Sequence, residues 1–368
     1  MKNNIAFGAW EATTILINLL FVQAVLTFPR EMVLRGGTAG WMIPVITTVL
    51  GIIYFSIVTY FYRKIGSKDL LDISRMLGGK TIEIIVGVFL STVLVIISSL
   101  VLNGFAHIIK GSSLNNSPVM YIFIFFLIGM ICCCYAGIEA NARISAILVP
   151  ILIVSFIVIT IGLISRYDMN NLFPVLGNGM QPILAASLSK ISIFSPVIII
   201  LLFMVPYFSS KYIKRVSFLT VGISGVILIW SVLSFILTFP YETAITKKMP
   251  LFQMARLFEF GNFISRIESV YVLITSIAGL MYLGTTFTFA VNIFAKALGL
   301  KHKKAIIPAF ALITVSLALF PISVNASIND SIYFNVIFYA CIFLPLVLIV
   351  LVNLKCFSKG RGEKTDEG

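Results

Sequence analysis

The chain has 368 residues, of which 59% are hydrophobic and only 11% are charged, whereas about a quarter of the residues in an ordinary soluble domain are charged. Apolar runs recur along the whole chain with no long polar segment between them, so we expect a single membrane domain over residues 1–368 and no soluble catalytic domain. The net charge of +13 comes from Lys and Arg residues in the short connections between apolar runs. That pattern reflects membrane topology and does not indicate a nucleic-acid partner.

Ten segments are long and apolar enough to cross a bilayer, which takes about 20 residues of helix. Their limits are 8–35, 40–62, 81–109, 118–136, 142–165, 188–208, 214–239, 263–297, 303–320 and 332–355. We therefore predict an all-α integral membrane protein. Between spans, residues 67–80 carry one apolar helical face and are expected to lie along the inner membrane surface, and residues 166–187 are expected to form a loop with short helical pieces.

Basic residues concentrate on one side of these spans. Placing the N-terminus inside puts 18 of the 27 Lys and Arg residues on the cytoplasmic side, and the positive-inside rule then favours both chain ends in the cytoplasm. The 18 residues are Lys2, Arg63, Lys64, Lys68, Arg75, Lys80, Arg143, Lys211, Lys214, Arg215, Lys296, Lys301, Lys303, Lys304, Lys355, Lys359, Arg361 and Lys364.

Two of the predicted spans contain a helix-breaking proline. In the first span Pro29 follows Phe28, and proline disfavours helix at the residue before it. We predict two half-helices separated by irregular backbone over 22–27, with Pro29 as the first residue of the second piece and Glu31 at the positive end of its dipole. The sixth span is interrupted at Ser195–Pro196. Such paired interruptions are typical of transporters that bind their substrate near the bilayer midplane, in folds built from two inverted repeats.

Ionisable residues inside the spans are few. Arg266 and Glu268 lie early in the eighth span, two residues apart and therefore on different faces. Arg266 is expected to pair with an acid such as Glu31 or Glu242, and Glu268 to face the bundle. Other charges lie near span ends, where they are expected to reach the interface: Glu11, Glu83, Arg143, Lys190 and Lys296. No row of carboxylates marks an ion path, so ion-coupled transport is not indicated.

The sequence shows no catalytic or metal-binding pattern. His107 and His302 stand alone, and we find no nucleophile motif or phosphate loop. The five cysteines have neither C-x-x-C nor Cys/His ligand spacing, and the run Cys132–Cys134 is typical of small packing residues. We therefore expect a protein that is not an enzyme and needs no metal or other cofactor.

Four ordered segments resemble one family. They are LTFPRE in span one, YAGIEANAR between spans four and five, NNLFPVLGNGMQPI before span six, and MPLFQMARLFEFGNFISRIES entering span eight. They are similar to segments of the B subunit of the nutrient germinant receptors of bacterial endospores, which belongs to the amino acid, polyamine and organocation transporter superfamily. The resemblance runs from about Ala9 to Cys356.

That resemblance implies ten spans in a five-plus-five inverted repeat of the LeuT type, with residues 8–165 as the first repeat, 188–355 as the second and 356–368 as a cytoplasmic tail. It implies the inner membrane of the dormant spore as the location. It also implies two partners, a receptor A subunit with membrane and soluble parts and a lipoprotein C subunit. The germinant, an amino acid or sometimes a sugar or nucleoside, would bind between the broken spans one and six and faces of spans three and eight.

The sequence departs from the family at both breaks. Family members usually carry a G-x-G-like pair where this chain has Val22-Gln23-Ala24, and the second break reads Ser195-Pro196-Val197-Ile198. Glycine allows positive φ and close approach of a carboxylate to backbone N–H groups, and valine resists both. We therefore expect a narrower pocket in which the Gln23 side chain replaces the backbone grip.

The predicted ligand contacts are Gln23, Ala24 and Thr27 in span one, Ser98 and Asn103 in span three, Ser192 and Ser195 in span six, and Thr285 and Thr288 in span eight. Structural or gating roles are predicted for Pro29, Arg30, Glu31, Pro196, Arg266 and Glu268. Three functions follow from these residues. The chain is a nutrient-sensing receptor subunit, a secondary transporter of amino acids or amines, or a receptor scaffold whose pocket has degenerated.

Overall fold

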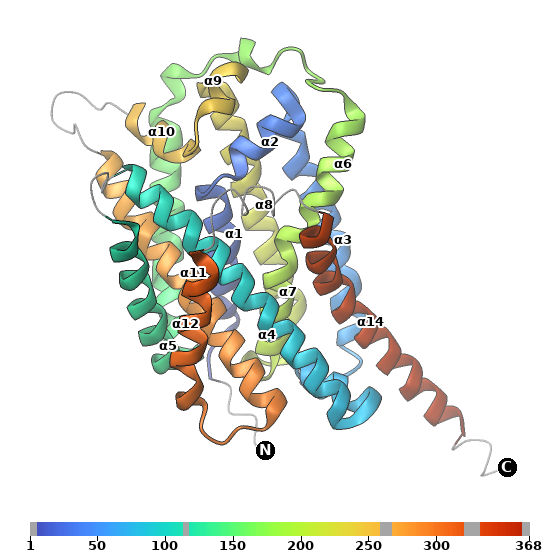
Figure 1. Cartoon of the computed structure of the whole chain (residues 1–368). Helices are drawn as coiled ribbons and strands as arrows, with labels where there is room; N and C mark the ends of the chain where they lie inside the picture. Colours follow the sequence, from blue (N-terminus) through green and yellow to red (C-terminus); the bar gives the residue numbers. More distant parts are fainter. Residues whose placement is uncertain (1–5, 113–117, 258–266, 320–331, 363–368) are drawn as a thin grey trace.

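The computed structural model describes residues 6–112, 118–257, 267–319 and 332–362, and every regular element in these ranges is helical, as predicted (Figure 1). The α-helices are α1 (Ala9–Val25), α2 (Phe28–Gly36), α3 (Met42–Tyr62), α4 (Leu70–Ser112), α5 (Val119–Gly162), α6 (Met180–Lys190), α7 (Ser195–Phe208), α8 (Ile213–Thr238), α9 (Tyr241–Thr246), α10 (Pro250–Leu257), α11 (Ile267–Leu298), α12 (Ile307–Ala318) and α14 (Ile332–Gly362). Helix α1 begins and α14 ends at the same end of the molecule (Figure 1).

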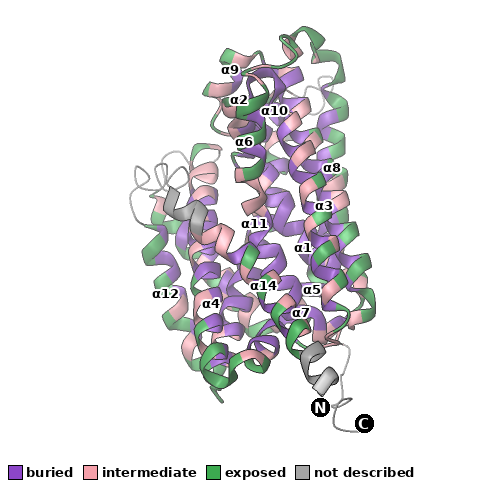
Figure 2. Ribbon diagram, turned by 90° about the vertical axis from the view of Figure 1, so that its right-hand side faces the viewer, coloured by how far each residue is buried: buried purple, intermediate pink, exposed green. Residues whose placement is uncertain are grey.

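Helices α1 and α7 lie at the centre of the bundle. Both are apolar on all sides and buried along most of their length, as expected for a helix without a solvent-facing stripe. Around them, α11 packs along α4 and α5, and α8 packs along α1 and α3. Buried residues therefore fill the interior of the bundle (Figure 2).

The outer faces of the peripheral helices are apolar. Large side chains such as Phe125, Ile147, Leu312 and Phe343 are more than half exposed on α5, α12 and α14. Seven described helical segments are long and apolar enough to cross a membrane, and the bent pair of α1 with α2 makes an eighth if it is one span. The chain is therefore a multi-pass membrane protein whose exposed apolar faces suit contact with lipid.

The number of spans depends on how α5 is counted. A straight helix of its 44 residues would be about 66 Å long, roughly twice the thickness of a bilayer core. Gly137 breaks the helix, with φ 89° and ψ 176°, and leaves pieces over 119–136 and 138–162. These pieces agree with the predicted spans 118–136 and 142–165. In the ninth predicted span, 303–320, the described residues form the 3-10 turn Lys303–Ile306 and the 12-residue α12. Ten spans therefore remain a prediction.

Helix α4 combines two predicted elements. A kink at Gly78 and Gly79, where Gly79 has φ 72°, separates residues 70–77 from the long apolar part of the helix. The start of α4 is tied to α11 by one lysine. Lys296 of α11 forms ion pairs with Asp69, just before α4, and with Asp72 in its first turn. The sequence predicted only that Lys296 reaches the membrane interface, and these ion pairs were not predicted.

The connection from α5 to α6 fixes the far end of α2. Asn178 donates to the carbonyl oxygens of Arg35 (3.2 Å) and Gly36 (3.3 Å), through its side chain and its backbone respectively. Gly177 has φ 47°, and a Cβ there would collide with the Gly36 carbonyl. The segment 166–187, predicted as a loop with short helical pieces, contains the 3-10 helix Met169–Leu172 and the start of α6 at Met180.

Candidate functional site

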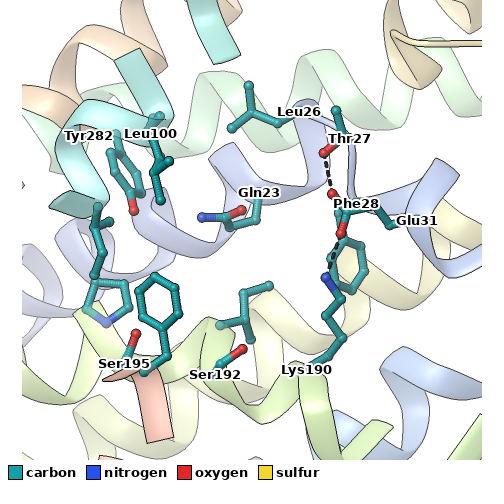
Figure 3. A pocket seen from close by; sticks show the side chains of 15 residues that line it. Gln23, Leu26, Thr27, Phe28, Glu31, Leu100, Lys190, Ser192, Ser195 and Tyr282 are labelled. Atoms are coloured by element: carbon teal, nitrogen blue, oxygen red, sulfur yellow. Dashed lines mark hydrogen bonds and ion pairs between the residues drawn. The ribbon is translucent and has the colours of Figure 1, made fainter. Parts of the chain in front are cut away.

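A cavity of about 190 Å³ lies where the two interrupted spans meet. Its walls come from the junction of α1 and α2, the middle of α4, the start of α7 with the turn before it, and single residues of α11 and α14. The apolar lining residues are Leu26, Phe28, Ile97, Leu100, Val101, Ile193, Pro196 and Phe338. The polar ones are Gln23, Thr27, Glu31, Lys190, Ser192, Ser195 and Tyr282 (Figure 3). The mixture suits a small molecule with both apolar and polar parts.

The first break is smaller than predicted. Helix α1 stays helical through Val25, and the chain is non-helical only at Leu26 and Thr27 before α2 begins at a bend of 59°. The prediction of irregular backbone is therefore wrong for residues 22–25. Val22 and Ala24 are fully buried in the bundle, and this packing keeps the end of α1 helical. The N–H group of Leu26 accordingly still bonds to the Val22 carbonyl at 3.1 Å, as in a continuing helix.

The second break is a single turn of 3-10 helix. It covers Ile191–Phe194 and joins α6 to α7, whose first two residues are Ser195 and Pro196. Proline is well tolerated there because the first turn of a helix has no partner for its N–H groups. Ser192 and Ser195 both line the cavity from this turn. At the predicted interruption the helix changes to one 3-10 turn beside the cavity, and Met180–Phe208 continue as one span without a bend like that between α1 and α2.

An ion pair between the two interrupted spans forms one wall of the cavity. Glu31 Oε2 of α2 lies 2.5 Å from Lys190 Nζ of α6. Thr27 donates its hydroxyl to the other carboxylate oxygen, Glu31 Oε1, at 2.6 Å. The two charged side chains are 23% and 18% exposed, so each is largely withdrawn from solvent. Removing one partner of such a pair leaves an unpaired charge that is costly to bury.

The neighbouring residues of the first break have structural contacts. Arg30 turns away from the cavity and donates from Nε to the carbonyl oxygen of Ile245 at 2.7 Å. That carbonyl lies in the last turn of α9, where a cation compensates the negative end of the helix dipole. Pro29 is buried in the first turn of α2. These contacts fit the structural roles predicted for Pro29 and Arg30.

Four predicted contacts line the cavity and five lie elsewhere. Gln23, Thr27, Ser192 and Ser195 line it. Ala24, Ser98, Asn103, Thr285 and Thr288 are buried but do not. Three of these five have protein partners: Ser98 donates to Thr286 Oγ1 at 2.8 Å, Asn103 to the Ala318 carbonyl at 2.7 Å, and Thr288 to the Gly284 carbonyl at 2.6 Å. The bonds of Ser98 and Asn103 join α4 to α11 and α12, whereas that of Thr288 lies within α11.

Three polar lining residues were not predicted as contacts: Glu31, for which a structural or gating role was predicted, Lys190 and Tyr282. Lys190 was expected to reach the interface, but it pairs with Glu31 beside the cavity. One sequence signal could have identified the pair: each of the two spans carries a charge within six residues of its proline. Glu31 follows Pro29, and Lys190 precedes Pro196. Tyr282 carries no such signal, because one aromatic residue in an apolar helix is usually core.

The remaining predicted charges have separate positions. Arg266 lies outside the described residues. Glu268 is half-buried in the first turn of α11. The predicted pairing of Arg266 with Glu31 or Glu242 therefore falls outside the described part of the chain, and within that part Glu31 pairs with Lys190.

The end of the cavity away from the ion pair carries hydroxyl groups. Tyr282 and Ser195 are 0% and 1% exposed, and neither hydroxyl has a hydrogen-bond partner among the described residues. The amide of Gln23 faces Tyr282 Oη (Figure 3) and is close enough to interact with it, without reaching the geometry of a hydrogen bond. Gln23 is half-buried, so its amide is a polar group that α1 offers to the cavity.

The family model of the Spore_permease proteins, described as spore germination proteins, matches residues 9–327. Among curated proteins, Spore germination protein A2 of Bacillus subtilis (strain 168) is 26% identical over 357 residues, which are 95% of this chain and 96% of that protein. Spore germination protein YndE of the same organism is 24% identical over 366 residues, 96% of this chain and 97% of its own. Spore germination protein B2 is 23% identical over 222 residues, 60% of each chain.

The matched region begins at the first residue of α1 and includes every residue of the cavity wall except Phe338. The full-length relatives share this extent and are named for spore germination. With its apolar helices and the interruptions in its first and sixth predicted spans, the chain belongs to the Spore_permease family of spore germination proteins.

Proposed function

We propose that this protein is a germinant receptor subunit that binds a small nutrient, an amino acid or a similar molecule, in the cavity between the interrupted spans. Binding there changes the relative position of α2 and α6, and partner subunits receive that change. The observation that supports this function is the Glu31–Lys190 ion pair, which lies on the cavity wall and joins the two interrupted spans. The named relatives support the role in germination.

The ion pair also indicates the chemistry of the ligand. An amino acid carries an ammonium and a carboxylate, which can bind Glu31 and Lys190 respectively and separate them. Each protein charge then keeps an opposite partner, so the exchange leaves no charge unpaired. A ligand with a single charge would leave one protein charge buried alone, which costs several kcal/mol by order of magnitude. The pair therefore favours zwitterions over simple amines and carboxylates.

The proposal includes a topology. Ten spans would form two inverted repeats, 8–165 and 188–355, with 356–368 as a tail and both chain ends in the cytoplasm. The positive-inside distribution of Lys and Arg supports the orientation, and the break at Gly137 supports counting α5 twice. The location would be the inner membrane of the spore. The partners would be the receptor A subunit and the lipoprotein C subunit.

Two alternatives use the same fold. A scaffold with a degenerate pocket is disfavoured by the cavity of about 190 Å³ and its polar lining. A secondary transporter would move the same ligands, and uptake of labelled amino acid into liposomes that contain this chain alone would favour it. If the chain is a receptor subunit, such liposomes take up no more label than empty ones.

Germination of spores that carry cavity variants tests the proposal. Spores in which this chain is replaced by the Glu31→Gln or the Lys190→Met variant are expected to lose the response to the nutrient that the wild-type chain restores. Glu139→Gln is the matched control, because Glu139 forms an exposed ion pair with Arg143 and does not line this cavity. An unchanged nutrient response in both cavity variants, with normal amounts of the protein in the spore, would contradict the proposal.

A further inference from the structure

The cavity has polar groups that the ion pair does not use. Tyr282 Oη and Ser195 Oγ are buried without a hydrogen-bond partner among the described residues. Both residues line the cavity at the end away from Glu31 and Lys190, and Gln23 lies between the hydroxyls and the pair (Figure 3). The cavity is therefore polar at both ends.

Apolar residues would fill the same positions more favourably if the hydroxyls had no role. Buried polar groups in proteins nearly always have a hydrogen-bond partner, and one without a partner destabilises the fold. Phenylalanine at 282 and alanine at 195 would occupy nearly the same space without that cost. Two unpaired hydroxyls on the wall of one cavity therefore indicate that a bound molecule supplies their hydrogen-bond partners.

We propose that this end of the cavity binds a second polar group of the ligand, so that the germinant is an amino acid whose side chain carries a hydroxyl or an amide. The inference rests on the proposed function, in which Glu31 and Lys190 hold the ammonium and the carboxylate. Tyr282 and Ser195 then bind the polar side chain, together with the Gln23 amide, which can both donate and accept. Rotation of the half-buried Gln23 side chain opens the way to both hydroxyls.

The same groups select against apolar amino acids. An apolar side chain can fill the space between Leu26, Ile97 and Leu100, but it leaves the hydroxyls unpaired. Sites that hydrogen-bond a hydroxyl or an amide reject analogues that lack it far more strongly than apolar pockets reject an extra methyl group. The preference should therefore be visible between amino acids of equal size.

Binding of two matched pairs of amino acids tests the inference. The full-length chain in lipid nanodiscs is titrated with L-threonine and L-valine, and with L-glutamine and L-methionine, and the midpoint of thermal unfolding gives each dissociation constant. In the wild-type chain we expect at least one polar member to bind about tenfold or more tightly than its apolar partner, a difference of about 1.4 kcal/mol. In the variant that combines Tyr282→Phe with Ser195→Ala, the two members should bind within about twofold of each other.

A matched control variant combines Tyr271→Phe with Ser224→Ala. Tyr271 and Ser224 are also buried with hydroxyls that lack a described partner, but neither lines the cavity. This variant should keep the wild-type preference. Without ligand, both Phe variants should unfold at the wild-type midpoint or above it, because each removes an unpaired hydroxyl. A lower midpoint for Tyr282→Phe alone would show that its hydroxyl is already paired and would overturn the inference.

The outcomes separate this inference from the function on which it rests. Binding of valine and methionine as tight as that of threonine and glutamine overturns the inference, while the receptor function survives. A polar preference that persists in the Tyr282→Phe, Ser195→Ala variant also overturns it, because the preference then arises elsewhere. The proposed function itself is contradicted if none of the four amino acids stabilises the chain saturably. It is also contradicted if Glu31→Gln and Lys190→Met leave the dissociation constants unchanged.

Discussion

Glu31 Oε2 and Lys190 Nζ lie 2.5 Å apart although 159 positions separate them in the sequence. The contact joins the second half of the first interrupted span to the first half of the sixth. Because both side chains also line the cavity, a ligand that competes for either charge acts directly on the connection between α2 and α6. Ligand binding and movement of these two helices are thereby linked at one contact.

The strength of this contact can be measured with a double-mutant cycle. Glu31→Gln and Lys190→Met are each expected to lower the free energy of unfolding by about 1–3 kcal/mol, because each leaves a largely buried charge without its partner. The double variant should lose less than the sum of the two, with a coupling of similar size. Denaturant titration of the purified chain gives all four values.

The exposed pair Glu139–Arg143 is the control for that cycle. Its side chains are 51% and 69% exposed, and exposed pairs of this kind contribute less than about 1 kcal/mol. Equal couplings in the two cycles would show that burial adds nothing to the Glu31–Lys190 contact.

Gln23 is expected to contribute to nutrient recognition. Its amide is the polar group of the α1 wall that the cavity exposes. In spores that carry Gln23→Ala, the nutrient concentration for half-maximal germination should rise about tenfold, which equals a loss of about 1.4 kcal/mol of binding. Gln253→Ala on α10 is the control, since that glutamine does not line the cavity. If both variants germinate with the wild-type midpoint, Gln23 is not part of the site.

We expect that only glycine is tolerated well at position 137, because of the backbone conformation there. Its φ of 89° is unfavourable for any residue with a Cβ, but no atom lies within 4 Å of the position that a Cβ would take. Gly137→Ala should therefore lower the free energy of unfolding by about 1–3 kcal/mol through conformation alone. Gly222→Ala, inside helix α8 and equally free of neighbours, should raise it by up to about 1 kcal/mol. Denaturation curves of both variants measure the difference, and a shift of the same sign in both would refute the break at Gly137.

Asp69 is expected to contribute more to stability than Asp72. Both pair with Lys296, but the Asp69 side chain is 6% exposed and that of Asp72 is 42% exposed. Asp69 Oδ1 also accepts from the backbone N–H groups of Leu71 (3.1 Å) and Asp72 (2.9 Å) and so caps the start of α4. We expect a loss of about 2–4 kcal/mol for Asp69→Ala and of about 1 kcal/mol or less for Asp72→Ala. Thermal unfolding ranks the two, and the reverse order would show that the cap and the buried pair are unimportant.

The helical fold was predictable because span length and hydropathy are local properties of the chain. The break between α1 and α2 was predictable for the same reason, since Pro29 acts on the residue next to it. At Pro196 the sixth span has only a turn of 3-10 helix, because proline is tolerated in the first turn of α7. The extent of the first break was not predictable, because tertiary burial of Val22 and Ala24 keeps helix where the local pattern allowed irregular backbone. Helix α6 begins at Met180 within the segment predicted to contain short helical pieces, and Pro182 is tolerated in its first turn.

The site was predictable only in part. Thr27, Ser192 and Ser195, which lie at or beside the predicted breaks, line the cavity because those segments form its walls. Lys190 and Tyr282 were missed because their roles depend on which residues they meet across the bundle. Ser98 and Asn103 were polar residues in apolar helices, and in the structure they donate to Thr286 and to the Ala318 carbonyl respectively. Sequence alone does not distinguish a hydrogen bond between helices from a contact with a ligand.

A structure of the chain with a stabilising amino acid bound tests the central claim most directly. The account predicts that the ligand ammonium lies within hydrogen-bond distance of the Glu31 carboxylate, that the ligand carboxylate contacts Lys190 Nζ, and that the two protein side chains have separated. An amino acid bound elsewhere in the bundle, or bound in the cavity with the Glu31–Lys190 pair intact, would contradict it.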